Sequence, residues 1–74
     1  MSKKTSIISK IVGQNIYMIR KRQGYTQYHI AKYLNMEQGN VSLCENGKLE
    51  LDYEKLVKLS RLLKVKIDDF FVNI

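Results

Sequence analysis

Apolar residues recur at helical spacing along nearly the whole of this 74-residue chain. No segment alternates apolar and polar residues for long, as a half-buried β-strand does, and no proline interrupts the pattern. The pattern therefore predicts an all-α fold. The length suits one domain with a thin core, and the single cysteine excludes a disulfide within the monomer. We therefore expect oligomerisation to contribute to its stability.

Capping and turn residues divide the pattern into five short helices. The first is expected to begin between Ser6 and Ser9 and to end at about Gln23, because Gly24 suits the positive φ of a helix stop. Four more are expected: one after the N-cap Thr26 and ending before Asn35, one from Glu37 to about Glu45, one after the N-cap Asp52, and one near Asp68 to Val72.

The connection between the second and third of these helices is only about three residues long. The two helices must therefore cross steeply, which exposes the outer face of the third. Spacing directs Val41 and Cys44 into the core. The residues left on the exposed side are Glu37, Gln38, Gly39, Asn40, Ser42 and Leu43.

Charge is distributed unevenly along the chain. Residues 1–36 hold seven basic residues and no acidic one, whereas residues 37–74 hold six basic and seven acidic, so the halves carry +7 and −1. A one-sided basic domain favours a polyanionic partner, either nucleic acid or a membrane surface. We expect residues 1–12 to form a basic arm or helix extension and residues 13–74 to form the domain. The N-terminus lacks the apolar run of a signal peptide, and no segment approaches a membrane span, so a cytoplasmic location is expected.

Catalytic chemistry has little support in the sequence. His29 is the only histidine, and Cys44 is assigned to the core, so a Cys–His nucleophilic pair is not favoured. No metal-ligand spacing, Gly-rich phosphate loop or nucleotide motif occurs. We therefore expect a protein that is not an enzyme and that needs no metal or other cofactor.

Three pieces of sequence occur in a fixed order: G-x-x-I-x-x-I-R at 13–20, G-Y-T-Q-x-x-I-A at 24–31 and V-S-x-x-E-N-G at 41–47. Together they resemble the helix-turn-helix family of the phage lambda Cro and CI repressors, also called the XRE family, over about residues 13–71. The resemblance implies a five-helix, lambda-repressor-like domain. It implies a transcriptional regulator, typically a repressor, that binds a palindromic operator in double-stranded DNA as a twofold homodimer and associates with the nucleoid when bound.

The resemblance also implies roles for particular residues. The third helix would read bases in the major groove, where all four base pairs are distinguishable. The expected base-reading residues are Gln38, Gly39, Asn40, Leu43 and Glu37. The expected DNA-backbone contacts are Gln27, Tyr28, Lys32, Ser42, Asn46 and Lys48. Arg20 and Glu45 match the family's partly buried ion pair, and Phe71 and Ile74 are expected at the dimer interface.

Two residues depart from the family's usual pattern. Asn35 stands where the turn usually has glycine, a mild change because asparagine tolerates positive φ. Glu37 stands where a serine or threonine cap is usual, and it would either accept a hydrogen bond from a cytosine amino group or face away from the DNA.

Other functions are compatible with the same fold. The nearest are a restriction–modification controller protein and an antitoxin-type autorepressor, which are also short members of the family. A protein-interaction adaptor that has lost DNA binding is an alternative of another class, although the basic N-terminal half argues against it. Because no sensory domain accompanies the helices, no small-molecule ligand is expected.

Overall fold

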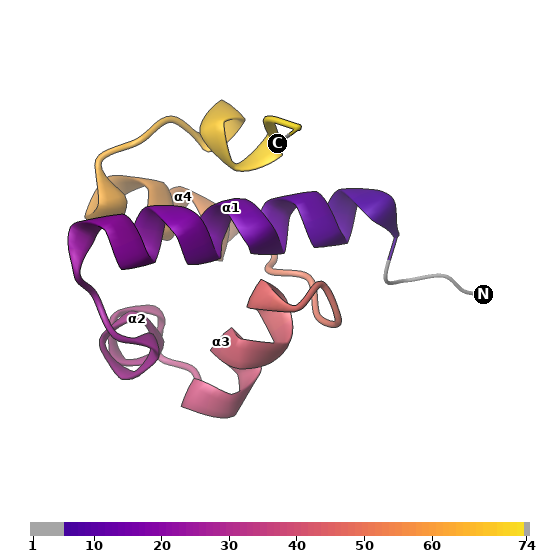
Figure 1. Ribbon diagram of the computed structural model, residues 1–74. Helices are drawn as coiled ribbons and strands as arrows, with labels where there is room; N and C mark the ends of the chain where they lie inside the picture. Colours follow the sequence, from indigo (N-terminus) through magenta and orange to yellow (C-terminus); the bar gives the residue numbers. More distant parts are fainter. Residues whose placement is uncertain (1–5, 74) are drawn as a thin grey trace.

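The computed structural model describes residues 6–73, which form four α-helices and one 3-10 helix and contain no strand. The elements are α1 (Ile7–Gln23), α2 (Gln27–Leu34), α3 (Gln38–Glu45), α4 (Tyr53–Leu63) and η1 (Ile67–Phe71). In Figure 1, α1 crosses the molecule with α2 and α3 on one side and the C-terminal segment on the other. The all-α prediction is confirmed.

The expected fifth helix is not a full α-helix. The segment is the five-residue 3-10 helix η1, which begins at Ile67 and ends before Val72 adopts extended backbone (φ −71, ψ 128). The carboxylate of Asp69 accepts a hydrogen bond from the backbone N–H of Lys66 at 3.1 Å, which closes a short turn. Such short pieces commonly adopt the tighter 3-10 geometry. The structure therefore does not confirm a count of five helices.

The predicted N-caps Thr26 and Asp52, and Ser6 at the start of α1, form local hydrogen bonds. Ser6 accepts from the backbone N–H of Ser9 at 3.2 Å, Thr26 from that of His29 at 3.0 Å, and Asp52 from that of Lys55 at 2.8 Å. Each bond satisfies an N–H group that has no partner within its own helix.

Left-handed residues end three of the helices. Gly24 (φ 84) ends α1 and Asn35 (φ 57) ends α2, as predicted, while Lys64 (φ 58) ends α4 in a conformation the sequence did not indicate. At α3 the prediction was one residue too long. Glu37 is the N-cap, and its side chain makes no capping hydrogen bond, so the helix itself begins at Gln38.

The core lies among α1, α2 and α4, and α3 and η1 pack against α1 from opposite sides. Its buried apolar side chains are Ile16, Ile19, Ile30, Ala31, Leu34, Val41, Leu59, Leu63 and Phe70. Ala31 is small and fully buried between helices, as the steep crossing of α2 and α3 requires. Phe70 is inaccessible to solvent, so η1 closes the core at the C-terminal end.

Two residues of α1 determine where the neighbouring segments lie. A Cβ at Gly13 would overlap the carbonyl oxygen of Cys44, so α1 touches the end of α3 backbone to backbone. The buried amide of Asn15 donates to the carbonyls of Phe70 (2.9 Å) and Val72 (2.7 Å), which holds the C-terminal segment on α1. No pattern in the sequence had indicated this role for Asn15.

Residues 7–12, expected in the N-terminal arm or extension, are the first turns of α1 and continue directly into residues 13–23. The rest of the expected arm, residues 1–5, lies outside the described residues. None of the described helices is both long enough and apolar enough to span a membrane.

Candidate nucleic-acid interface

The third helix has the two faces expected from its sequence. Val41 and Cys44 are buried against the core, while Gln38, Gly39, Asn40 and Leu43 are exposed and Ser42 is partly covered. The side chain of Leu43 is 41% exposed. The outer face of α3 is therefore free to contact another molecule.

Arg20 of α1 and Glu45 at the end of α3 form a two-pronged ion pair. Nε of Arg20 lies 2.6 Å from Oε2 of Glu45, and Nη2 lies 3.0 Å from Oε1. The side chains are only 7% and 4% exposed. The remaining Nη1 donates to the backbone carbonyl of Tyr25 at 2.8 Å, so one guanidinium joins α1, the turn before α2 and α3.

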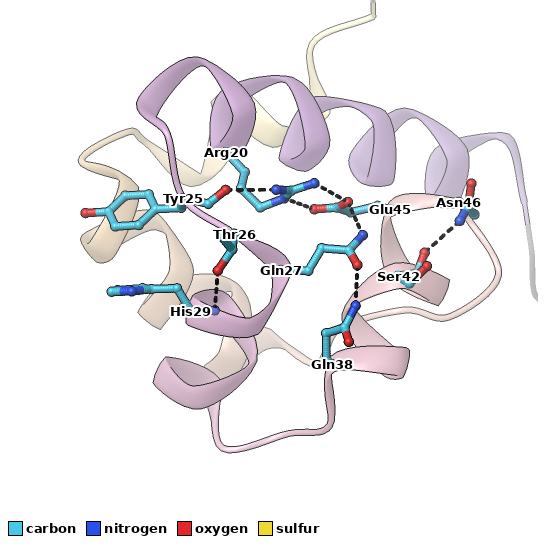
Figure 2. Close-up of polar contacts among 9 residues, drawn as sticks. All are labelled: Arg20, Tyr25, Thr26, Gln27, His29, Gln38, Ser42, Glu45 and Asn46. Atoms are coloured by element: carbon cyan, nitrogen blue, oxygen red, sulfur yellow. Dashed lines mark hydrogen bonds and ion pairs between the residues drawn. The ribbon is translucent and has the colours of Figure 1, made fainter.

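Two glutamine amides extend this ion pair to the surface. Nε2 of Gln27 donates to Oε1 of Glu45 at 2.8 Å, and Nε2 of Gln38 donates to Oε1 of Gln27 at 2.7 Å. Figure 2 shows the resulting chain of contacts from Arg20 through Glu45 and Gln27 to Gln38. The first residue of α3 is thus held in place by a buried charge pair.

The link to Gln27 leaves much of the Gln38 amide available. Its carbonyl oxygen accepts no hydrogen bond from the described part of the chain, and an amide nitrogen has a second hydrogen to donate. An acceptor and a donor side by side can pair with the N6 and N7 edge of adenine.

The other expected contact residues flank α3 on two sides. On α2, Tyr28 is 64% exposed, and Nζ of Lys32 lies 5.8 Å from the centre of its ring. After α3, the amide of Asn46 donates to the carbonyl of Ser42 at 2.9 Å, and Lys48 is exposed. Donors and positive charge therefore lie on both sides of the exposed helix face.

Glu37, the N-cap of α3, and Asn40 lie near the loop that leads to α4. They line a shallow hollow with Glu50, Asp52 and Lys55 of the loop that leads to α4 and its first turn. Two further carboxylates therefore lie near these two residues. Glu37 also lines a hollow with Tyr28, Lys32 and Gln38, so it lies between α2 and this acidic loop.

Cys44 behaves as a packing residue. Burial, and secondarily the negative charge of Glu45, raise the pKa of its thiol to about 11. A thiol with such a pKa stays protonated and is a poor nucleophile or metal ligand at neutral pH. Among the described residues, no group of three His, Cys, Asp or Glu side chains is arranged to hold a metal ion.

The helix-turn-helix family model HTH_3 matches residues 16–70, which include the whole of this arrangement. The chain belongs to the HTH_3 helix-turn-helix family. This confirms the resemblance found in the sequence, and membership of this family identifies the HTH_3 protein as a DNA-binding regulator of transcription. No curated protein matches its sequence.

Solved structures of regulators share the fold of the HTH_3 protein. The restriction-modification controller protein C.AhdI from Aeromonas hydrophila matches with a TM-score of 0.77 and 21% identity over 85% of this chain and 96% of its own. The clp gene regulator ClgR from Corynebacterium glutamicum matches with a TM-score of 0.82 and 21% identity over 90% of this chain and 71% of its own. A mutant of the restriction-modification controller protein C.Esp1396I matches with a TM-score of 0.75 and 27% identity over 89% of this chain and 84% of its own.

Proposed function

We propose that this HTH_3 protein is a sequence-specific repressor that inserts the exposed face of α3 into the major groove of duplex DNA. The observation that supports this most directly is the chain of contacts from the buried Arg20–Glu45 pair to the exposed amide of Gln38. A base-reading side chain is most selective when its position is fixed before the DNA arrives, because less side-chain freedom is then lost on binding. The protein acts by binding rather than by catalysis.

Gln38 and Leu43 are the proposed principal readers. The free edge of the Gln38 amide suits adenine, and the exposed side chain of Leu43 suits a thymine methyl group. Packing within the protein does not require glycine at position 39, because a Cβ there would meet no protein atom within 4 Å. The missing side chain would instead let the DNA approach the backbone of α3 closely. Glycine inside a helix costs about 1 kcal/mol relative to alanine, and the protein's own packing offers no reason for it.

Glu37 and Asn40 are proposed to read at the margin of the site. Asn40 can pair with adenine and Glu37 can accept from a cytosine amino group. Their position beside Glu50 and Asp52 gives this edge a negative charge, which favours base edges over phosphates as partners.

Backbone contacts are proposed on both sides of α3. Gln27, Tyr28 and Lys32 would contact one strand, and Ser42, Asn46 and Lys48 the other. Such contacts position the protein on the duplex and carry little sequence information of their own.

Paired substitutions separate the two roles. Gln38→Ala is expected to weaken binding to the cognate site by about 1–3 kcal/mol and binding to random duplex much less, because it removes a base contact. Lys32→Ala is expected to weaken both alike and to lower the slope of log K against log salt by about one, because it removes one phosphate contact. Binding is measured after selecting sites from random duplex DNA. Equal affinity for all sequences at every salt concentration would contradict sequence-specific recognition.

We also propose that the protein binds a palindromic operator as a homodimer. Phe71 is 45% exposed and lines an apolar cavity together with Ile8, Leu49 and other residues, and Val72 beside it is also exposed. Asn15 holds this segment on α1, so its apolar surface is presented rigidly. Such an apolar surface suits burial against a second copy of the protein. A dimer would also contact two half-sites of the operator, and the sum of both sets of contacts gives the affinity that specific binding needs. Ile74, the other residue expected at this interface, lies outside the described residues.

Analytical ultracentrifugation at tens of micromolar, with and without operator DNA, tests the dimer. We expect a dimer for the wild type and weakened association for Phe71→Ser, because the substitution removes exposed apolar surface, and thermal unfolding of the variant verifies that its fold is intact. Tyr33→Ser on α2 is the matched control, since it removes a similarly exposed aromatic ring elsewhere. A wild-type monomer under both conditions would rule out the dimer.

The second candidate function is control of a restriction–modification system. It is favoured by the similarity to C.AhdI and C.Esp1396I, the latter at 27% identity. The gene next to that of the HTH_3 protein would then encode a restriction or modification enzyme, and the selected DNA site would recur upstream of it. A toxin gene in that place would indicate an antitoxin-type autorepressor instead. If selection enriches no duplex sequence, a protein-interaction adaptor becomes the better interpretation.

A further inference from the structure

One polar edge of α1 has no part in the arrangement described so far. Lys10, Gln14 and Tyr17 are spaced by four and three residues, so they lie on one face of the helix, and all three are exposed. They line a hollow with Gln27, Glu45 and Asn46, where α1 passes the start of α2 and the end of α3. We call these three residues the α1 edge.

The hollow is electropositive. Of the described residues that line it, Glu45 alone is acidic, and both of its carboxylate oxygens already accept hydrogen bonds, from Arg20 and from Gln27. Residues 1–36, which supply all of α1 and the start of α2, contain no acidic residue. The lining therefore offers an ammonium group, a phenol hydroxyl and amide N–H groups, a set of donors that suits an anion.

Lys10 is held against the turn that follows α3. A Cβ at Gly47 would lie 2.9 Å from the α-carbon of Lys10 and 2.7 Å from its Cγ. Gly47 stands between Asn46 and Lys48, which are proposed to contact the DNA backbone. The charge of Lys10 therefore adds to the same side of the protein as those two residues.

Tyr17 is positioned by the ion pair that also positions Gln38. The guanidinium carbon of Arg20 lies 5.4 Å from the centre of the Tyr17 ring, within the range of a cation–π contact. Because the ring is held through its face, its hydroxyl remains available as a donor. A neutral donor whose ring is fixed in this way can make a directional hydrogen bond to a phosphate oxygen.

We infer that the α1 edge binds one phosphate of the DNA backbone, in addition to the contacts made from α2 and from the turn after α3. This inference rests on the proposed function. A phosphate of the bound duplex fits better than a free anion, because the hollow is open and supplies a single full positive charge. The hollow also borders Asn46, next to the turn against which Lys10 is held, so the strand proposed to contact Asn46 and Lys48 would pass beside it.

Affinity measured against salt concentration tests the two donors separately, on cognate and on random duplex DNA. Lys10→Ala is expected to lower the salt slope by about one, because one fewer counterion is released. Tyr17→Phe keeps the ring over Arg20 and removes only the hydroxyl, so affinity should fall about tenfold with the slope unchanged. Arg22→Ala is the matched control. It removes a positive charge from the same helix about 120° around the axis from Lys10, and both affinity and slope should stay close to wild type.

Uncharged methylphosphonate groups, placed at one phosphate at a time in the selected site, locate the contact. One position should weaken the wild type about tenfold or more. It should weaken Tyr17→Phe by a smaller factor, because the tyrosine hydrogen bond is already absent there and only the contact with Lys10 is left to lose. Thermal unfolding of Tyr17→Phe verifies that the fold is intact. If Lys10→Ala and Tyr17→Phe bind as wild type while Gln38→Ala loses discrimination, the α1 edge is not a phosphate site and the proposed function stands. If the wild type binds no duplex DNA, both proposals are wrong.

Discussion

Glu45→Gln is expected to lower the free energy of unfolding by about 3–5 kcal/mol. The substitution removes the negative charge opposite a guanidinium that is almost inaccessible to solvent, and the buried positive charge is then uncompensated. Because a small domain has only about 5–15 kcal/mol of stability in total, the variant should be much closer to unfolding. Urea denaturation followed by circular dichroism measures the change.

A surface ion pair provides the control. Glu54 and Lys58 are one helical turn apart on α4, with 3.9 Å between Oε2 and Nζ, and both side chains are about half exposed or more. Glu54→Gln should change stability by less than about 1 kcal/mol, because water and salt screen an exposed pair. If Glu45→Gln is as stable as Glu54→Gln, the Arg20–Glu45 pair does not support the fold.

The double variant Arg20→Met with Glu45→Leu separates stability from function. Apolar residues that replace both partners of a buried pair often restore stability, because neither charge then has to be desolvated. The same double variant removes the carboxylate that holds Gln27 and, through it, Gln38. We therefore expect a recovery of stability, relative to Glu45→Gln, without a recovery of sequence discrimination.

Gly13→Ala is expected to destabilise the protein by about 3 kcal/mol, the upper end of the usual cost of an overpacked core. The added methyl group would overlap the carbonyl oxygen of Cys44 and lie 2.9 Å from that of Glu45. Both are backbone atoms, so α1 and α3 must separate to admit it. This cost outweighs the gain of about 1 kcal/mol that alanine brings to a helix interior. The thermal unfolding midpoint measures the net change.

Gly39→Ala is the matched substitution, because it adds the same methyl group to another helix where nothing lies within 4 Å. It should stabilise the protein by up to about 1 kcal/mol, and it should weaken DNA binding if the DNA backbone or bases approach this point. A stabilising Gly13→Ala would contradict the close contact of α1 with α3.

Local chemistry explains why so much of the secondary structure was predictable. Thr26 and Asp52 cap their helices through N–H groups three residues away. Gly24 adopts positive φ because it has no Cβ, and Asn35 because its short polar side chain tolerates that conformation. The direction of Val41 and Cys44 into the core follows from helical periodicity alone. A short helix was predicted near η1, but its 3-10 type was not, since five residues carry too little pattern to distinguish a 3-10 helix from an α-helix.

The residues of the candidate site were predictable from the sequence, whereas the hydrogen bonds and packing contacts between them were much less so. Residue types and the family resemblance were enough to indicate Gln27, Gln38 and the Arg20–Glu45 pair. The resemblance also implies that Gln27 steadies the start of the third helix, but the specific hydrogen bond from Gln38 to Gln27 was not predicted, and neither was the α1 edge. Both depend on how closely α1, α2 and α3 approach one another.

The sequence by itself determined the all-α class, the helix ends at Gly24 and Asn35, and the helix-turn-helix with its exposed third helix. Only the tertiary structure decided that Asn15 holds Phe70, 55 residues away, and that Gly13 admits the backbone of α3. It also decided that a buried charge pair fixes the position of Gln38 on the surface. The physical reason is the range of the interactions. Capping and periodicity act within one or two turns of helix, whereas these contacts exist only once distant segments have packed together.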